Sequence, residues 1–477
     1  MVFPVVGGTQ STGYDIDNSL RLSKDSATYV YKDFDDTGTL NTKGTFSWWN
    51  KIYQQSSDMY MMSVRNDASP EEHIHIRYQN PMIQGQFYKS SSQYAQIITN
   101  NYFRDHTAWM HFVLKMDSTD GTANNRIRLF VNNQEVSYAT QSMPNQNQDF
   151  IISKVATHQF GNHYSGTGSH FDGGLADVHF IDGQAKDPTD FGETNDNGVW
   201  IPKQYTGTYG DHGYRLEFKQ TGTSQNSSGI GADTSGNDNH FASNSLVALD
   251  IVTDTPTNNF CTFNPLSNSH QSFIPTLSEG NTIMSSDGAD AACFGTFGVS
   301  NGKWYWELKG TESDNGGVQK WTPGVIGAED HSEYSNRDGG YAPKATALYL
   351  GNSNVYQNNS SVSSAYFTAT QNDIIGVAFD ADNNKIYWHK NGTYGNSGDP
   401  TSGATGTGGI STTAAHAPFI PIVGEGSGHE QKIEANFGNP PFSISSGNSD
   451  ANGYGNFEFA VPSGYYALCT KNLAKYG

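Results

Sequence analysis

Short runs of alternating apolar and polar residues, separated by clusters of Gly, Asn, Asp and Ser, recur along this chain from end to end. In the run 126–136, Ile127, Leu129 and Val131 fall on one face of a strand, and the pair Asn132-Asn133 then offers a tight turn. Helical periodicity is hard to find anywhere. The pattern therefore predicts an all-β protein of short strands joined by turns.

The composition excludes chain classes that do not build a packed core. Aromatic residues make up 13% of the chain and charged residues only 16%, whereas a disordered chain has few aromatics and dense charge. A chain of 477 residues also exceeds what one core usually organises, so two domains are expected. Evenly spaced strands with Gly-rich turns predict β-sandwiches of the jelly-roll type.

The character of the sequence changes near residue 218. The stretch that follows is polar and rich in Gly, Ser and Asn, and alternation remains sparse to about residue 285. We therefore predict a jelly-roll domain over 1–218, a long irregular and extended linker over 219–285, and a second β-sandwich over 286–477.

The charge balance disfavours nucleic acid and membranes as partners. Acidic residues number 47 against 27 basic residues, and the net charge of −20 repels phosphate groups and anionic lipids. No run approaches the roughly 18 apolar residues of a membrane span. The first ten residues lack a basic segment ahead of their Gly pair, so we expect no secretory signal.

Three cysteines lie far apart in the sequence, at Cys261, Cys293 and Cys469. Their number is odd and no two of them have the CxxC spacing of zinc or redox sites. We therefore expect buried free thiols rather than disulfides or a zinc site.

Three segments of the C-terminal half resemble the SPRY domain, in the order that this family has them. They are GKWYWELKG (302–310), NDIIGVAFDADNNKIYWHKNG (372–392) and IEANFGNPPF (433–442). The resemblance implies an antiparallel β-sandwich that binds partners through the loops at its end.

Four segments of the N-terminal half resemble LamG and concanavalin-A-like jelly rolls in their order. They are FSWWNKIYQQ (46–55), WMHFVLKMD (109–117), RIRLFVNNQEV (126–136) and FDGGLADVHFIDG (171–183). This resemblance implies a lectin-like sandwich and raises the question of carbohydrate binding.

A third resemblance covers segments outside both modules, and it is to virion structural proteins of marine tailed bacteriophages. The segments are 5–23, 233–241, 254–266 and 464–473. In that family a jelly roll precedes a SPRY module, and the proteins are often described as tail fibres. The resemblance implies a homo-oligomeric virion component, released by lysis, whose partners are other virion proteins and a host surface polysaccharide or protein. It leaves open a capsid or tail decoration subunit without a host-binding role.

Concanavalin-like folds include glucanases, so carboxylate pairs are candidates for catalysis. Retaining glycosidases need two carboxyl groups about 5 to 5.5 Å apart, which neighbouring positions on one strand face would supply. Asp172, Asp177 and Asp182 are spaced by five, so adjacent members fall on opposite faces of a regular strand. No Gly-x-Ser-x-Gly elbow in a strand and helix context is found either. We therefore expect no catalytic residue and a protein that is not an enzyme.

Two histidines at alternate positions are candidate metal ligands. His73 and His75 share a strand face, and by resemblance to trimeric phage fibres such a pair could hold iron about a symmetry axis. We favour an exposed strand face carrying His73, His75 and Arg77. Asp172, next to two glycines, is a candidate ligand of Ca²⁺ by resemblance to LamG domains. Ca²⁺ takes roughly six to eight oxygen ligands, and one acidic residue in a loop is little evidence for such a site. No metal or other cofactor is expected.

Aromatic residues supply the remaining candidates. Four tryptophans in strand contexts are expected in the cores, namely Trp48, Trp49, Trp304 and Trp306. Five others sit among Gly, Asn, Ser and Asp, where loops would present them to solvent: Trp321, Tyr334, Tyr341, Tyr356 and Tyr394. Flat rings beside short polar side chains suit sugars, so these five are the predicted ligand-binding residues, with ordinary loop aromatics as the alternative.

Overall fold

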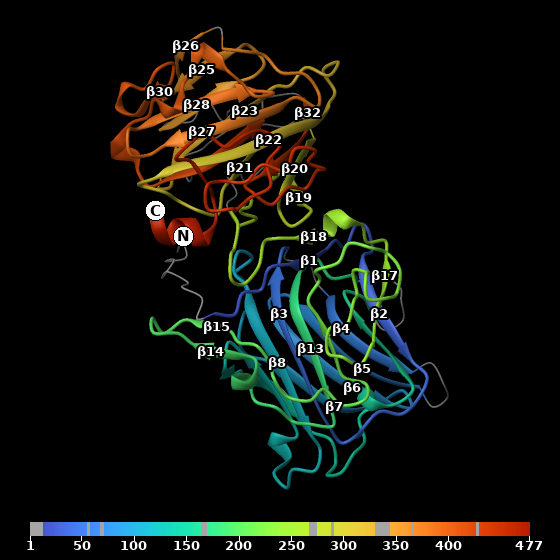
Figure 1. Cartoon of the computed structure of the whole chain (residues 1–477). Coiled ribbons are helices and arrows are strands. Elements are labelled where there is room, and N and C mark those ends of the chain that lie inside the picture. Colours follow the sequence, from blue (N-terminus) through green and yellow to red (C-terminus); the bar gives the residue numbers. More distant parts are fainter. Residues whose placement is uncertain are drawn as a thin grey trace. The chain divides into compact units, whose positions relative to one another are not determined.

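The computed structural model describes residues 13–54, 58–66, 71–163, 169–266, 274–287, 291–329, 344–364, 366–425 and 429–477. Strands account for 45% and helices for 7% of the chain, so the all-β prediction is confirmed. The chain folds into two compact units (Figure 1). Among the described residues, those up to 257 form the N-terminal unit and those from 258 onward form the C-terminal unit.

Two antiparallel sheets, each of eight strands within the described residues, build the N-terminal unit. Sheet A contains, in spatial order, β10 (Gln134–Glu135), β9 (Ile127–Val131), β8 (Met110–Asp117), β3 (Lys43–Ile52), β13 (Gly173–Asp182), β1 (Ser19–Leu22) and β18 (Ile251–Val252), with β16 (Tyr214–Leu216) paired to β13. Sheet B contains β11 (Tyr138–Ser142), β7 (Ser92–Thr99), β6 (Met82–Lys89), β5 (Glu72–Gln79), β4 (Met59–Asn66), β12 (Ala156–Phe160), β2 (Tyr29–Phe34) and β17 (Ala242–Asn244). A ribbon of β14 (Gly192–Thr194) and β15 (Trp200–Pro202) is separate from both sheets.

Sheets A and B pack face to face around one apolar core. On β5, Ile74 and Ile76 are buried in this core because alternate residues of a strand point to the same side. On sheet A, Trp48 stacks on Phe112 of the neighbouring strand, with ring centroids 5.5 Å apart. Burial of such large rings is the main favourable contribution to a sandwich of this kind.

Two further sheets build the C-terminal unit. Sheet C contains β19 (Thr276–Ser278), β20 (Ile283–Asp287), β32 (Glu430–Asn436), β22 (Lys303–Ser313), β27 (Ile374–Asp380), β28 (Lys385–Lys390) and β29 (Thr393–Tyr394), with β30 (Ile410–Ser411) paired to β28 and β33 (Tyr466–Ala467) paired to β22. Sheet D contains β21 (Ala292–Phe294), β31 (Phe419–Glu425), β23 (Trp321–Gly327), β24 (Ala345–Tyr349), β25 (Asn354–Gln357) and β26 (Ser360–Ser363). Their shared core includes Trp304, Trp306, Trp321 and Trp388.

Helical structure in the described residues consists of short pieces. The helix α1 spans Thr470–Tyr476. Short 3-10 helices occur at η1 (Ala123–Asn125), η2 (Ile151–Ser153), η3 (Pro188–Asp190), η4 (Ala248–Asp250), η7 (Gly395–Ser397), η8 (Pro400–Thr405) and η9 (Ala414–His416). Among the described residues, no helix has the length and apolar character needed to cross a bilayer.

Two hairpins have the tight turns that their sequences predict. Asn132 and Asn133 join β9 to β10 with φ of 47° and 65°, and Asn391 and Gly392 join β28 to β29 with φ of 48° and 84°. Positive φ at both central positions is the requirement of a type I′ turn, whose twist matches that of the strands. Asn and Gly adopt this conformation at low cost.

The predicted domain boundaries 1–218, 219–285 and 286–477 need correction. The described residues of 219–285 are mostly irregular, as expected, but they are divided between the two units at residue 257 rather than linking them. In the N-terminal unit β17 pairs with β2 and β18 pairs with β1, so this part completes both sheets. In the C-terminal unit β20 pairs with β32. Short strands at sheet edges carry too little alternation to be seen in the sequence.

All three cysteines are buried free thiols, as predicted. Cys261, Cys293 and Cys469 lie in the interior of the C-terminal unit, and none takes part in a disulfide.

Candidate functional site

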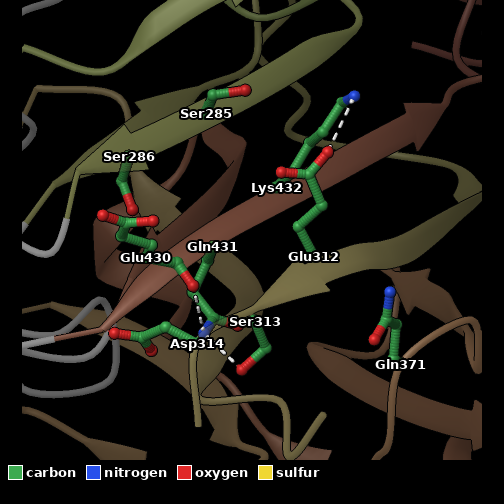
Figure 2. A pocket seen from close by; sticks show the side chains of 9 residues that line it. All are labelled: Ser285, Ser286, Glu312, Ser313, Asp314, Gln371, Glu430, Gln431 and Lys432. Atoms are coloured by element: carbon green, nitrogen blue, oxygen red, sulfur yellow. Dashed lines mark hydrogen bonds and ion pairs between the residues drawn. The ribbon is translucent and has the colours of Figure 1, made fainter. Parts of the chain in front are cut away.

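An open polar pocket of about 310 Å³ lies in the C-terminal unit where β20, β22 and β32 run side by side (Figure 2). All of its lining residues have polar side chains: Ser285, Ser286, Glu312, Ser313, Asp314, Gln371, Glu430, Gln431 and Lys432. Hydroxyl, amide, carboxylate and ammonium groups all reach it. Such a lining favours a ligand that forms hydrogen bonds over an apolar one.

Strand register brings these residues together from three distant segments of the chain. Lys432 of β32 pairs with Ser285 of β20 on one side and with Glu312 of β22 on the other. Directly opposed residues of antiparallel strands point to the same side of the sheet, so the three side chains form one row. The ends of three strands thus supply a fixed, preorganised set of polar groups.

A β-bulge in β22 shapes the end of this row. The pairing of β22 with β32 shifts between Gly310 and Glu312, which leaves Thr311 as the additional residue. Gln371, from the turn before β27, donates its side-chain amide to the carbonyl oxygen of Thr311. The bulge therefore anchors a residue from another loop at the rim of the pocket.

Carboxylates outnumber cations in the pocket. Glu312, Asp314 and Glu430 line it together with a single ammonium, that of Lys432, whose Nζ lies 3.2 Å from Glu312 Oε1 (Figure 2). The Glu312 side chain is 68% exposed, and exposed ion pairs of this kind contribute at most about 1 kcal/mol. A ligand can therefore separate the pair at little cost, and the excess of carboxylates favours donors such as hydroxyl or cationic groups.

A histidine outside the lining orients Asp314. Lys320 Nζ lies 2.7 Å from His429 Nε2, and because an ammonium only donates, Nε2 is the acceptor. The ring hydrogen is therefore on Nδ1, which donates to Asp314 Oδ1 over 3.0 Å. This chain of contacts holds the carboxylate of Asp314 in place at the pocket.

The five aromatic residues predicted from the sequence do not form this site. Trp321 lies in β23, fully buried in the core, where Nε1 donates to Gln319 Oε1 at 2.7 Å. Tyr356 lies in β25 and is only 8% exposed. The expectation that loops present both rings to solvent is wrong, because the polar residues around them belong to turns and to the outward face of short strands.

The other three predicted residues have different outcomes. Tyr394 is half-buried in β29, with its ring against that of His389 at a centroid distance of 5.2 Å. Tyr334 and Tyr341 lie outside the described residues. None of Trp321, Tyr356 and Tyr394 lines the pocket.

Sequence reasoning missed the pocket because its signal is weak. In the run 430–436, Glu430, Lys432 and Glu434 alternate with Gln431, Ile433 and Ala435, which indicates a strand with one charged face. Charged strand faces are common on protein surfaces. Only the pairing with β20 and β22 makes this one a pocket.

The surroundings of the histidine pair on β5 differ from those expected from the sequence. His73 and His75 are 6% and 2% exposed, so the exposed strand face expected for them is wrong. Tyr88 stacks on His73 at a centroid distance of 4.5 Å, and Tyr60 packs against His75 at 5.0 Å. Within the described ranges, no group of three or more His, Cys, Asp or Glu residues is placed to hold a metal ion.

The three aspartates of 172–182 are all buried, and they do not follow a regular strand. A bulge lies between Ala176 and His179, and Asp177 has a φ of 43°. Asp177 accepts hydrogen bonds from the Tyr14 hydroxyl and from Arg215 Nε, both over 3.0 Å. Asp182 accepts from backbone N–H groups and from the Ser153 hydroxyl. Donors of the surrounding chain thus hold these two carboxylates in structural roles.

A serine and a histidine also meet in the N-terminal unit. Ser47 Oγ lies 2.8 Å from His111 Nε2, and both residues are buried. Trp200 Nε1, which can only donate, contacts His111 Nδ1 at 3.1 Å, so the ring hydrogen is on Nε2 and points at the serine. This tautomer cannot accept the serine proton, so the pair does not have the arrangement of a nucleophile and its general base.

One family matches part of the chain. Its model covers residues 303–440, which run from β22 to just beyond β32. It is the SPRY domain. The match takes in seven of the nine pocket residues, all except Ser285 and Ser286.

Solved structures of low similarity include the SPRY domain of human HERC1, with 18% identity and a TM-score of 0.29 over 36% of this chain and 96% of that one. A heptameric SAP-like pentraxin from Limulus polyphemus has 15% identity and a TM-score of 0.26 over 36% of this chain and 80% of its own. A candidate carbohydrate-binding protein from Bacteroides ovatus has 12% identity and a TM-score of 0.32 over 48% of this chain and 59% of its own. No curated protein matches the chain.

Proposed function

We propose that this protein is a non-enzymatic recognition subunit of a tailed-phage virion, and that the pocket of the C-terminal unit engages a protein or glycan on the host surface. The observation that carries the proposal is the overlap of the pocket with the SPRY match over 303–440. The resemblance to phage virion proteins supplies the biological setting, and an acidic pocket on rigid strands supplies the chemistry.

The chemistry of the pocket fits recognition rather than bond making. Its groups are preorganised by strand register, by the bulge at Thr311 and by the contact of His429 with Asp314. Carboxylates accept hydrogen bonds from sugar hydroxyls or from basic side chains of a protein, and amides both accept from and donate to sugar hydroxyls. Several copies on one particle would convert weak single contacts into avidity.

Binding of the fluorescently labelled full chain to a panel of marine bacterial strains tests this function. We expect saturable binding to some strains. Glu312→Lys reverses the charge next to Lys432 and should weaken the binding by about tenfold, which corresponds to about 1.4 kcal/mol. The matched control is Glu135→Lys, which breaks the exposed ion pair of Arg128 and Glu135 in the N-terminal unit and should leave the binding unchanged.

Two results would contradict the proposal: an absence of saturable binding to every strain, or equal losses in the two variants. Electron microscopy of virions labelled with antibody to this chain gives the location. Label on tail structures supports host recognition, whereas label confined to capsid faces contradicts it and favours a decoration subunit.

A further inference from the structure

A row of polar side chains crosses the outer face of sheet B in the N-terminal unit. Strand pairings join Gln159 to Ser63, Ser63 to His75, His75 to Gln86 and Gln86 to Gln96, across β12, β4, β5, β6 and β7. Figure 1 labels β4, β5, β6 and β7. Paired residues of antiparallel strands project to the same side. The inward-pointing neighbours on these strands belong to the core, so this row belongs to the face turned away from it.

The outer face of sheet A is different, because its side chains, both apolar and polar, are buried against other parts of the chain. Val113, Phe130 and Ile181 on that face are buried against Phe191 and Tyr205, from the segment between β13 and β16. The row on sheet B consists of amides, a hydroxyl and an imidazole. Its members on β12, β4 and β5 are buried, whereas those on β6 and β7 are partly exposed. The part of the row on β6 and β7 therefore carries the side-chain chemistry of a binding face.

Tyr88 forms the accessible end of a ring stack on this face. Its ring centroid lies 4.5 Å from that of His73, and the His73 ring lies 5.6 Å from that of His75 with only 13° between their planes. Both histidines are buried, whereas Tyr88 is half-buried. The stack holds the tyrosine ring in a fixed orientation, and a fixed, partly exposed ring is a suitable platform for the C–H face of a sugar.

A network of amides lies next to this ring. His75 Nε2 contacts Gln86 Oε1 at 2.8 Å, and Gln86 Nε2 donates to Gln93 Oε1 at 3.1 Å. The Tyr88 hydroxyl donates to the same Gln93 oxygen at 3.0 Å. Among the hydrogen bonds of the described residues, none uses Gln93 Nε2, and Gln93 is exposed, so its two amide hydrogens are available to a ligand oxygen beside Tyr88.

On β5, Arg77 is paired with a carboxylate and the two histidines are uncharged, which favours an uncharged ligand. Arg77 Nη1 lies 3.2 Å from Asp58 Oδ1, and Arg77 Nε donates to Gln84 Oε1. Burial lowers the pKa of His73 to about 4 and that of His75 to about 3, so both rings are uncharged at neutral pH. The chain as a whole carries a net charge of −20, which repels an anionic polymer.

We propose that the outer face of β5, β6 and β7 binds an uncharged polysaccharide, with Tyr88 as the stacking platform and Gln86 and Gln93 as hydrogen-bonding partners of its hydroxyl groups. The site lies in a different unit from the acidic pocket and uses none of its residues. It therefore stands or falls independently of the function proposed for the pocket.

Binding of the purified full chain to an array of polysaccharides tests this proposal. The array contains uncharged polymers (dextran, laminarin, galactomannan, xyloglucan, agarose and bacterial mannan) and anionic polymers (alginate, carrageenan and dextran sulfate). We expect capture by at least one uncharged polymer. Calorimetric titration with that polymer then compares variants, and Tyr88→Ala should weaken binding by about tenfold through loss of the stacked ring.

The controls separate this site from a general loss of structure and from the pocket. Tyr102→Ala removes a tyrosine that is 60% exposed in the same unit, and Glu312→Lys alters only the pocket, so both should bind the polymer as the unaltered chain does. Should Tyr88→Ala fail to fold, as judged by its unfolding midpoint, Gln93→Ala at an exposed position decides. Weaker binding by Gln93→Ala supports the proposal, and unchanged binding overturns it.

Three other results would overturn the proposal. These are capture by anionic polymers alone, capture by none of the polymers, and an equal loss of binding in Tyr88→Ala and Tyr102→Ala.

Discussion

The carboxylate of Glu307 accepts the backbone N–H of Phe459 at 2.8 Å, across 152 residues of sequence. It also accepts the N–H of Glu458 at 2.9 Å, the hydroxyl of Tyr305 at 2.9 Å and the side-chain amide of Asn436 at 3.3 Å. Glu307 is fully buried on β22. One side chain thus fastens the segment at 458–459 to sheet C of the C-terminal unit.

Replacement of Glu307 by alanine should destabilise the C-terminal unit by about 3 kcal/mol, because it leaves several buried donors without an acceptor. Urea unfolding, monitored through the hydrogen exchange of backbone amides in β22, reports on this unit alone. Glu312→Ala, on the same strand but exposed, is the matched control and should change the free energy of unfolding by less than about 0.5 kcal/mol. Equal effects of the two substitutions would contradict the role assigned to Glu307.

Glu307 also gives the C-terminal unit a pH dependence of known sign. Burial raises the pKa of Glu307 above its ordinary value of 4.5, against the hydrogen bonds that lower it. The folded state therefore binds the proton more tightly, and the stability from this group is fully present below pH 4.5 and is lost as the pH rises through the folded pKa. Relative to Glu307→Gln, the unaltered chain should gain stability on acidification from neutral pH. The difference in unfolding free energy between the two proteins, measured across this range, checks the sign, and a constant difference would contradict it.

Acid should act in the opposite direction on the N-terminal unit. His158 is fully buried between the Ile152 carbonyl and the Tyr214 hydroxyl, and burial lowers its pKa to about 3. Its contribution to stability is present above the unfolded value of 6.5 and is lost as the pH falls below it, by about 1.4 kcal/mol per pH unit. The effect of His158 is expected between the folded pKa of about 3 and the ordinary value of 6.5. Between neutral pH and about pH 5, the unfolding free energy of this unit should therefore fall less steeply in His158→Gln than in the unaltered chain. Tyr102→Ala should keep the original slope, and an identical slope in all three proteins would refute the assignment.

The thiols should be unreactive in the folded protein. Burial raises the pKa of Cys469 to about 12 and that of Cys293 further, so neither forms the reactive thiolate at neutral pH. Titration with Ellman's reagent should detect no thiol in the folded chain and all three after unfolding in guanidinium chloride. A thiol that reacts before unfolding would show that its surroundings open.

Much of the fold could be predicted from local sequence, because strand alternation and turn chemistry are local properties. The Asn391-Gly392 turn and the core positions of Trp304 and Trp306 are examples. The boundary at residue 257 could not be predicted, since strands such as β17 and β18 have three and two residues and are defined by their partners. Non-local pairing leaves no periodic signal in so short a segment.

The candidate sites are less accessible to sequence reasoning. Trp321 has polar neighbours in the sequence but lies in a core strand, so local composition predicts the wrong environment for it. His73 and His75 are recognisable as a pair, yet their burial depends on Tyr88 and Tyr60 from neighbouring strands. Pairing register, which a single sequence does not carry, decides which polar residues share one surface.

Recognition by two separate surfaces, one in each unit, is the central claim, and cell binding of four proteins tests it most directly. These are the unaltered chain, Glu312→Lys, Tyr88→Ala and the double variant, titrated on a bacterial strain that the unaltered chain binds. Each single substitution should weaken binding, and the double variant should bind least, because two linked contacts act with avidity. Undiminished binding by the double variant would show that neither surface recognises the cell.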